Sequence, residues 1–169
     1  MSVSVVWESI KHEFEPEGEW RGEWRDIYVL NNGEQDCENV LTFLRTSNYD
    51  LTFFRDGEQA ELPQTARDIC VISENEHCIL STDIGDNCLN CLFLGFFAEE
   101  IEFYFDPRDV HDLLSFNRLL DFVKHLAKVV DKPVGISMGN HREETFLKFV
   151  PKTNKLIYQV NNTEQEIEI

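Results

Sequence analysis

A chain of 169 residues, 42% hydrophobic and 28% charged, has the composition of one folded domain. Its 32 acidic and 15 basic residues give a formal net charge of −17. This charge argues against direct binding of nucleic acid or of an anionic membrane surface, since both require basic patches. The sequence holds no run of about 18 apolar residues, and its start lacks the basic segment of a secretory signal. We therefore expect neither a bilayer-spanning nor an exported protein.

The N-terminal segment is predicted to form a hairpin. Partial alternation of apolar residues over 3–14 predicts a first strand, and the composition of Glu15–Gly18 predicts a turn. Three aromatic residues of one parity, Trp20, Trp24 and Tyr28, predict a second strand over 20–30 that pairs with the first. In this hairpin the indoles would point inward and the intervening carboxylates outward.

The next segment is predicted to contain a helix and a second hairpin. Asp36 is a plausible N-cap, and the apolar residues behind it recur at the helical period, which predicts a helix over about 36–47. A strand follows over 49–55. Asp56-Gly57 is a strong hairpin signal, leading into a strand over 58–62 that Pro63 ends.

Short apolar runs dominate the middle of the chain. Two of them, at 69–72 and 78–81, flank a polar stretch and are interpreted as a further hairpin within 66–82. Two more strands are expected over 91–97 and 101–105. In the latter, apolar and polar side chains alternate, which predicts burial of one face.

A long helix is predicted to begin at Asp106-Pro107, where the aspartate would cap the helix, and to end near Asp131. Strands are expected over 134–137, 145–150 and 156–160. We predict an α+β fold over 1–161, with a mostly antiparallel multi-strand sheet and one long and one shorter helix packed on it. Residues 162–169 would form a polar tail or an added edge strand.

The five cysteines fall in no short disulfide pattern and mostly have apolar neighbours, so we expect free core thiols and a cytoplasmic protein. Cys88 and Cys91 form a CxxC motif. The apolar run behind it predicts a strand, whereas a redox pair needs a helix N-terminus. A zinc site using His77 and Cys78 would lack a second ligand pair. We therefore predict no metal site and no cofactor.

One segment has the spacing of a hydrolase motif. Gly135–Gly139 reads GxSxG, with Ser137 at its centre, after a short apolar strand. A nucleophile elbow requires a helix after the turn, but residues 140–144 lead into a predicted strand. We assign no catalytic residue, and a small hydrolase remains the second alternative function.

The surplus of carboxylates is the most distinctive feature of the sequence. Residues 1–40 contain 10 acids and 3 bases, and residues 50–109 contain 14 acids and 3 bases. Solubility is one explanation, and a partner of opposite charge is the other. Two groups of acids near aromatic residues are the predicted partner-binding surface: Glu13, Glu15, Glu17, Glu19, Glu23 and Asp26, then Glu99, Glu100 and Glu102.

The C-terminal stretch, KPVGISMGN at 132–140 and TFLKFVPKTNKLIY at 145–158, is similar to endings of small bacterial proteins, some encoded beside toxins. Together with the acidic charge and small size, the chain resembles immunity proteins of bacterial toxin–immunity pairs, including contact-dependent inhibition systems. The resemblance implies a protein that binds and occludes a basic cognate toxin domain such as a nuclease, and we expect a monomer or a dimer. An acidic DNA mimic or regulatory adaptor is the first alternative.

Overall fold

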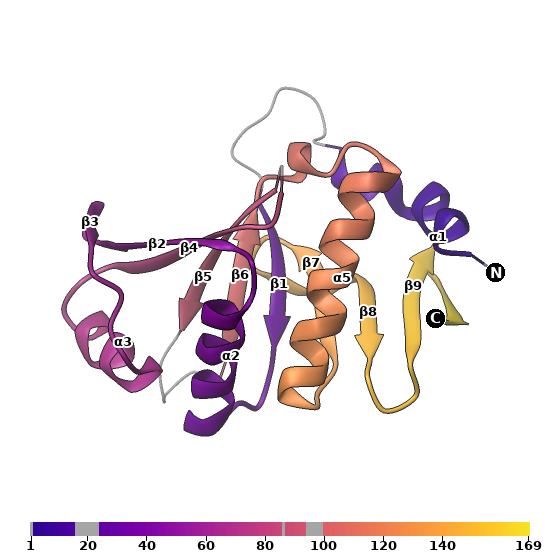
Figure 1. Cartoon of the computed structure of the whole chain (residues 1–169). Helices are drawn as coiled ribbons and strands as arrows, with labels where there is room; N and C mark the ends of the chain where they lie inside the picture. Colours follow the sequence, from indigo (N-terminus) through magenta and orange to yellow (C-terminus); the bar gives the residue numbers. More distant parts are fainter. Residues whose placement is uncertain (1, 16–23, 86, 94–99) are drawn as a thin grey trace.

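The computed structural model describes residues 2–15, 24–85, 87–93 and 100–169 (Figure 1). These residues form an antiparallel sheet of ten strands in the order β10-β9-β8-β7-β1-β6-β5-β4-β2-β3. The strands are β1 Arg25–Val29, β2 Asp50–Arg55, β3 Glu58–Ala60, β4 Cys78–Asp83, β5 Cys88–Phe93, β6 Ile101–Phe105, β7 Val134–Met138, β8 His141–Val150, β9 Lys155–Val160 and β10 Thr163–Glu168. The α-helices are α1 Val3–Ile10, α2 Glu34–Thr46, α3 Ala66–Ser73 and α5 Leu113–Val130. The predicted α+β class is confirmed.

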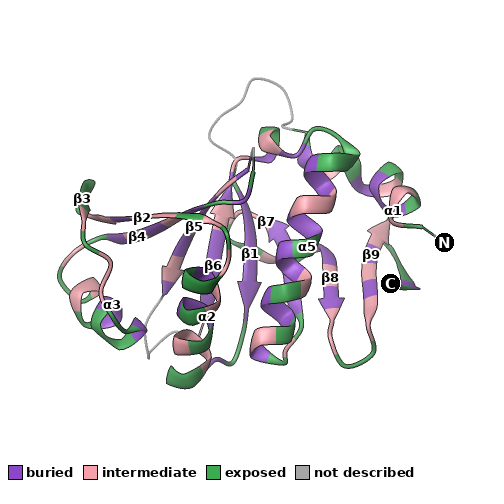
Figure 2. Ribbon diagram, in the orientation of Figure 1, coloured by how far each residue is buried: buried purple, intermediate pink, exposed green. Residues whose placement is uncertain are grey.

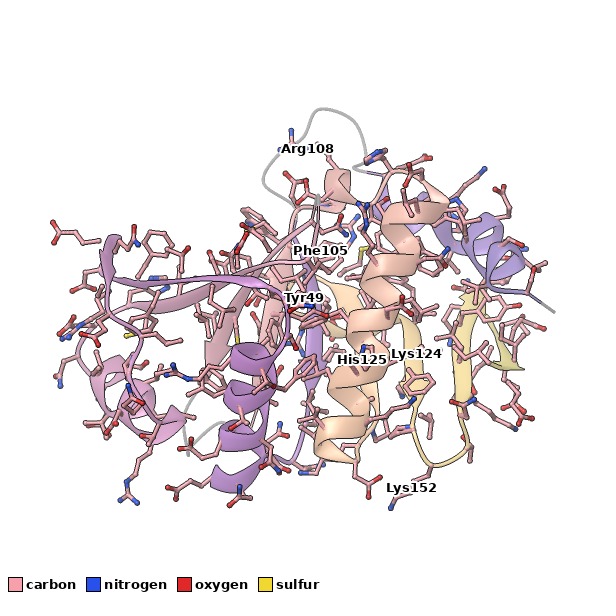
Figure 3. All side chains as sticks on the ribbon, in the orientation of Figure 1. Tyr49, Phe105, Arg108, Lys124, His125 and Lys152 are labelled. Carbon is pink, nitrogen blue, oxygen red and sulfur yellow. The ribbon has the colours of Figure 1, made fainter. Side chains whose placement is uncertain are left out.

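The helices lie on one face of the sheet, with α2 and α5 side by side across its centre (Figure 1). The central strands β1 and β6 are largely buried, as their purple colour in Figure 2 shows. Phe103 of β6 packs on Phe122 of α5, with ring centroids 5.1 Å apart. Tyr49 and Phe105 lie in this layer, whereas Lys152 projects from the β8–β9 turn (Figure 3). The helix side of the sheet therefore holds the apolar core.

The predicted first strand is wrong, because residues 3–10 form helix α1 and residues 11–14 a 3₁₀ helix. Val6, Trp7 and Ile10 are buried on one side of α1, and the Trp7 ring lies 5.2 Å from that of Phe116. Apolar residues at this spacing also fit a helix, and the contact with α5 selects it. The predicted pairing with a second strand is therefore also wrong. Strand β1 pairs instead with β6 and β7.

The predicted hairpin within 66–82 is half wrong, because its first half is helix α3. The Thr65 hydroxyl accepts a hydrogen bond from the Asp68 N–H at 3.1 Å, capping the helix. The buried side chains of Ala66, Ile69 and Cys70 make its inner face. The second half is β4, which pairs with β2 and β5.

The long helix α5 begins after Asp112, later than predicted. The Asp112 carboxylate accepts the Ser115 N–H at 2.7 Å and caps α5, while Asp106 caps a short 3₁₀ turn over Pro107–Asp109. The sequence therefore offers two caps in succession, and the structure uses the second for the long helix.

The remaining strands agree with prediction in type and differ at their ends. Strand β8 begins at His141 rather than at residue 145, and β5 begins at Cys88 rather than at residue 91. The predicted continuation of β5 over 94–97 lies outside the described residues. Residues 163–168 form an added edge strand rather than a tail. The Asp56-Gly57 turn is confirmed, with both residues at positive φ.

Across the part of the chain that is described, no helix combines the length and apolar character needed to cross a membrane.

Candidate functional site: an acidic groove on the uncovered face of the sheet

The face of the sheet opposite the helices carries polar side chains across its centre. Asp26 of β1 lies between Tyr104 of β6 and Ser137 of β7 in the register, and Ser137 lies beside Thr145 of β8. Their parity is opposite to that of the buried core residues, so their side chains point away from the helices. None of the described α-helices lies over this side, which we term the uncovered face (Figure 1).

An open groove of about 1220 Å³ lies on this face, near the end of the sheet where β1 begins and β6 ends. Segment 12–15, strand β1, strand β6 and the β7–β8 hairpin contribute to its lining. Among the described residues, the charged side chains other than histidine that line it are one base, Arg25, and six acids: Glu13, Glu15, Asp26, Glu102, Glu143 and Glu144. We call this site the acidic groove.

A cluster of charged side chains beside the groove centres on Arg142 of β8. Its guanidinium donates to Asp26 Oδ2 at 3.0 Å, to Glu102 Oε2 at 2.7 Å and, through Nε, to Glu100 Oε1 at 2.9 Å. It also donates to Ser137 Oγ at 3.2 Å. We call Asp26, Glu100, Glu102 and Arg142 the Arg142 cluster. Three carboxylates facing one guanidinium leave a formal charge of −2.

The sheet holds this cluster in place. Tyr28 stands opposite Glu102 in the β1–β6 pair, and its ring centroid lies 4.5 Å from the Arg142 guanidinium carbon. The Tyr28 hydroxyl also forms a hydrogen bond of 2.6 Å with Thr145. Beneath the ring lies Gly135, where a Cβ atom would approach Tyr28 to 2.6 Å. The first glycine of the GxSxG segment is therefore required for packing.

The β7–β8 turn fixes the carboxylate of Asp26. The Asn140 N–H donates to Asp26 Oδ2 at 2.7 Å, and a register shift in β8 near Ser137 brings Arg142 over the same oxygen. The Asp26 side chain is only 4% exposed, so charged and backbone donors replace the water that it lost. The Asp26 carboxylate is therefore buried, and the prediction that it points outward from the N-terminal hairpin is wrong for this residue.

Burial changes the acid–base properties of the cluster. Burial, followed by the nearby charge of Asp26, raises the pKa of Glu102 above its ordinary value, although Arg142 opposes this. Burial also disfavours the charge of Arg142, but its hydrogen bonds to Glu100 and Asp26 raise its pKa. Keeping the carboxylates of the cluster ionised therefore costs free energy, because they are buried close together.

An aromatic pair lies at the edge of the groove. Trp24 and Tyr104 both line it, with ring centroids 5.3 Å apart at an interplanar angle of 80°. Trp24 is 39% exposed, so the prediction of an inward-pointing indole is wrong for this residue, although it holds for Trp7. Trp20 lies outside the described residues. A large exposed aromatic side chain beside carboxylates is typical of an interface anchor.

The structure brings together two groups of predicted binding residues that are far apart in the sequence. Glu13, Glu15, Asp26 and Glu102 line one groove, and Glu100 joins them through Arg142. Pairing of β1 with β6 causes this convergence. The other four predicted residues, Glu17, Glu19, Glu23 and Glu99, lie outside the described residues.

Among the charged residues of the described site, sequence reasoning missed Arg25 of β1 and three residues of β8. Arg142, Glu143 and Glu144 lie at the start of β8, where the sequence predicts the approach to a strand. Their signal is the run His141-Arg-Glu-Glu144 directly after the Gly139-Asn140 turn, because a tight turn there folds β8 back along β7.

The residues that the sequence offered for an enzyme, Ser137 and the Cys88/Cys91 pair, are not arranged for catalysis in the described structure. Ser137 is buried in β7, donates to no base in the described structure, and is followed by a turn and strand instead of a helix. Cys88 and Cys91 are three residues apart on β5 and so point to opposite faces. Burial raises the pKa of the Cys88 thiol to about 11 and that of Cys91 well above its ordinary value. Within the described residues, no three His, Cys, Asp or Glu side chains are grouped to hold a metal ion.

Comparison with protein-family models, with curated proteins and with solved structures finds no match for this chain.

Proposed function

We propose that this chain is an inhibitory binding protein of the immunity type, which acts in the cytoplasm by occluding a basic cognate toxin domain, a nuclease being the favoured class. The observation that carries the proposal is the convergence of two acidic segments on one groove of the uncovered face. The resemblance of the C-terminal stretch to proteins encoded beside toxins adds to it.

The groove has the physical properties that such binding needs. Six carboxylates of the described residues line it, and the apolar core lies on the helix side of the sheet. A concentrated negative potential attracts a basic partner from a distance and accelerates association. Trp24 and Tyr104 then offer apolar area beside the charges, where contact with the partner would slow dissociation.

The Arg142 cluster gives this site rigidity. Each carboxylate of the cluster is held by hydrogen bonds before any partner arrives. Binding to side chains that are already ordered costs less conformational entropy than binding to flexible ones. The partner would therefore meet a fixed pattern of charge, and no turnover or cofactor enters this mechanism.

Charge reversal at matched positions tests the proposal. The variant Glu143→Lys/Glu144→Lys changes the groove, and Glu74→Lys/Asp121→Lys makes the same change in net charge at exposed positions of the helix layer. Each would be co-expressed in bacteria with toxin domains encoded next to this gene, and growth would be measured. We expect the groove variant to lose protection and the helix-layer variant to keep it.

The association rate supplies a second readout. With purified proteins, the groove variant should associate at least about tenfold more slowly than the helix-layer variant at low salt, and the gap should close as salt rises. Equal protection and equal rates for both variants would refute the groove as the binding site. Capture of a DNA-binding host protein in place of a toxin would support the DNA-mimic or adaptor function instead.

A further inference from the structure

The two edge strands of the sheet differ in how open they are. Strand β3, Glu58–Ala60, is three residues long and is followed by Pro63. Strand β10, Thr163–Glu168, is six residues long, contains no proline and pairs with β9 in an unbroken register. Among the described strands β10 has β9 as its one neighbour. Short edges and prolines discourage further strand addition, so β10 is the edge that is available for it.

The β9–β10 turn shows which backbone groups of β10 face outward. Asn161 and Asn162 form the two-residue turn, both at positive φ, and Val160 and Thr163 flank it as a hydrogen-bonded pair. The odd-numbered residues of β10 therefore form the main-chain hydrogen bonds to β9. The Ile169 N–H follows this pattern, donating to the Asn154 carbonyl at 3.0 Å. The N–H and C=O groups that point away from β9 are those of Glu164, Glu166 and Glu168.

The same three residues carry the charge of this edge. Their side chains are exposed and share one parity, which places them on the uncovered face. Lys155 neutralises one of them, with Nζ 2.5 Å from Glu166 Oε1. A second copy of β10 would bring like charges together and is disfavoured. A strand that carries Lys or Arg at alternate positions would match both the backbone groups and the carboxylates.

We propose that β10 binds an extended, basic segment of a partner protein as an eleventh strand of the sheet, with alternate Lys or Arg side chains opposite Glu164, Glu166 and Glu168. Main-chain hydrogen bonds supply affinity in this mode of recognition, and the alternating side chains supply specificity. The site adjoins the acidic groove, whose lining reaches Gln159 and Asn162 at the β9–β10 turn, but the proposal does not depend on what the groove binds.

The experiment titrates the full chain with the peptide Ac-KTKTKTKT-NH2 and follows backbone amides by heteronuclear NMR. A peptide of the same sequence with N-methyl groups on alternate residues keeps the charge but cannot form the ladder. We expect the first peptide to shift resonances of β9 and β10 and to slow hydrogen exchange of Glu164, Glu166 and Glu168 amides at least about tenfold. The N-methylated peptide should have neither effect.

Three variants separate the contributions. Glu166→Pro removes an outward N–H and should abolish binding, because proline is tolerated at an edge but cannot donate. Glu164→Gln/Glu166→Gln/Glu168→Gln keeps the ladder and should bind at least about fivefold more weakly. The groove variant Glu143→Lys/Glu144→Lys should bind the peptide as the wild type does. Equal binding of both peptides, shifts confined to the groove, or no binding at all would overturn the proposal.

Discussion

Arg142 stabilises a group of carboxylates that would repel one another without it. Asp26 and Glu102 are almost fully buried, and their hydrogen bonds to Arg142 compensate for lost hydration. Removing one partner of a buried ion pair leaves the other charge uncompensated, which costs far more than losing a surface pair. Arg142 is therefore a residue of this site that stabilises the fold.

We predict that Arg142→Met, which keeps much of the side-chain volume, lowers the free energy of unfolding by about 3 kcal/mol. The measurement is urea denaturation at neutral pH. Arg67→Met is the control, because Arg67 pairs with Glu34 on the surface, where both side chains are well exposed. A loss for Arg142→Met no larger than that for Arg67→Met would contradict the prediction.

The raised pKa of Glu102 makes a prediction about pH. Because the folded state binds this proton more tightly than the unfolded chain, stability falls as pH rises from the ordinary value of 4.5 through the raised pKa. Glu102→Gln removes this titration and keeps an oxygen for Arg142. We expect its stability relative to the wild type to increase between about pH 4 and about pH 7. Denaturation midpoints of both proteins across this range provide the check. A variant whose stability relative to the wild type stays constant or falls as pH rises would contradict the prediction.

At the level of elements, the long helix α5 and most of the strands were predictable, whereas the short helices α1 and α3 were not. The pattern of α5 continues over many turns, and the Asp56-Gly57 turn has a strong local preference, so both are found in the sequence. Helices α1 and α3 have eight residues each, too few for periodicity alone to distinguish a helix from a short apolar strand. Contacts with the core determine that these segments are helices, and such contacts are not visible in the local sequence.

The candidate site was predictable in its chemistry and not in its geometry. The acids of 13–26 and 99–102 stand out by composition, but their convergence depends on β1 pairing with β6. The alternation of side chains along a strand shows which residues share a face, but it does not show which other strand pairs with it. Arg142 was missed for the same reason, because its role arises from the fold of β8 along β7.

Helix α3 supplies a test at this scale. Thr65 caps it by accepting the Asp68 N–H, so Thr65→Ala should lower the free energy of unfolding by about 1 kcal/mol. Thr65→Ser keeps the hydroxyl and should stay close to the wild type. The measurement is chemical denaturation followed by circular dichroism. Equal stability of the two variants would show that the hydroxyl contributes nothing to the helix.

For the whole molecule, the net charge of −17 opposes compaction. Added salt screens this repulsion, so we predict that the thermal midpoint rises as NaCl increases from about 0.05 M to about 0.5 M. Sodium chloride is suitable because it screens charge without the strong surface exclusion of sulfate. Differential scanning calorimetry provides the measurement. A midpoint that falls with salt would mean that attractive pairs, such as Arg55–Glu76, outweigh the repulsion.

Each strand of this sheet contributes side chains to both the helix-covered face and the uncovered face, and exposed residues of one face have little effect on the packing of the other. Consecutive residues alternate between the faces, so replacing Tyr104 or Glu144 leaves the layer beneath α2 and α5 unaltered. Mutations could then accumulate at exposed positions of the open side, outside the Arg142 cluster, exchanging one target for another over generations, while the scaffold persists. Descendants of a common ancestor would retain the inward-facing apolar positions and diverge most where the sheet is bare.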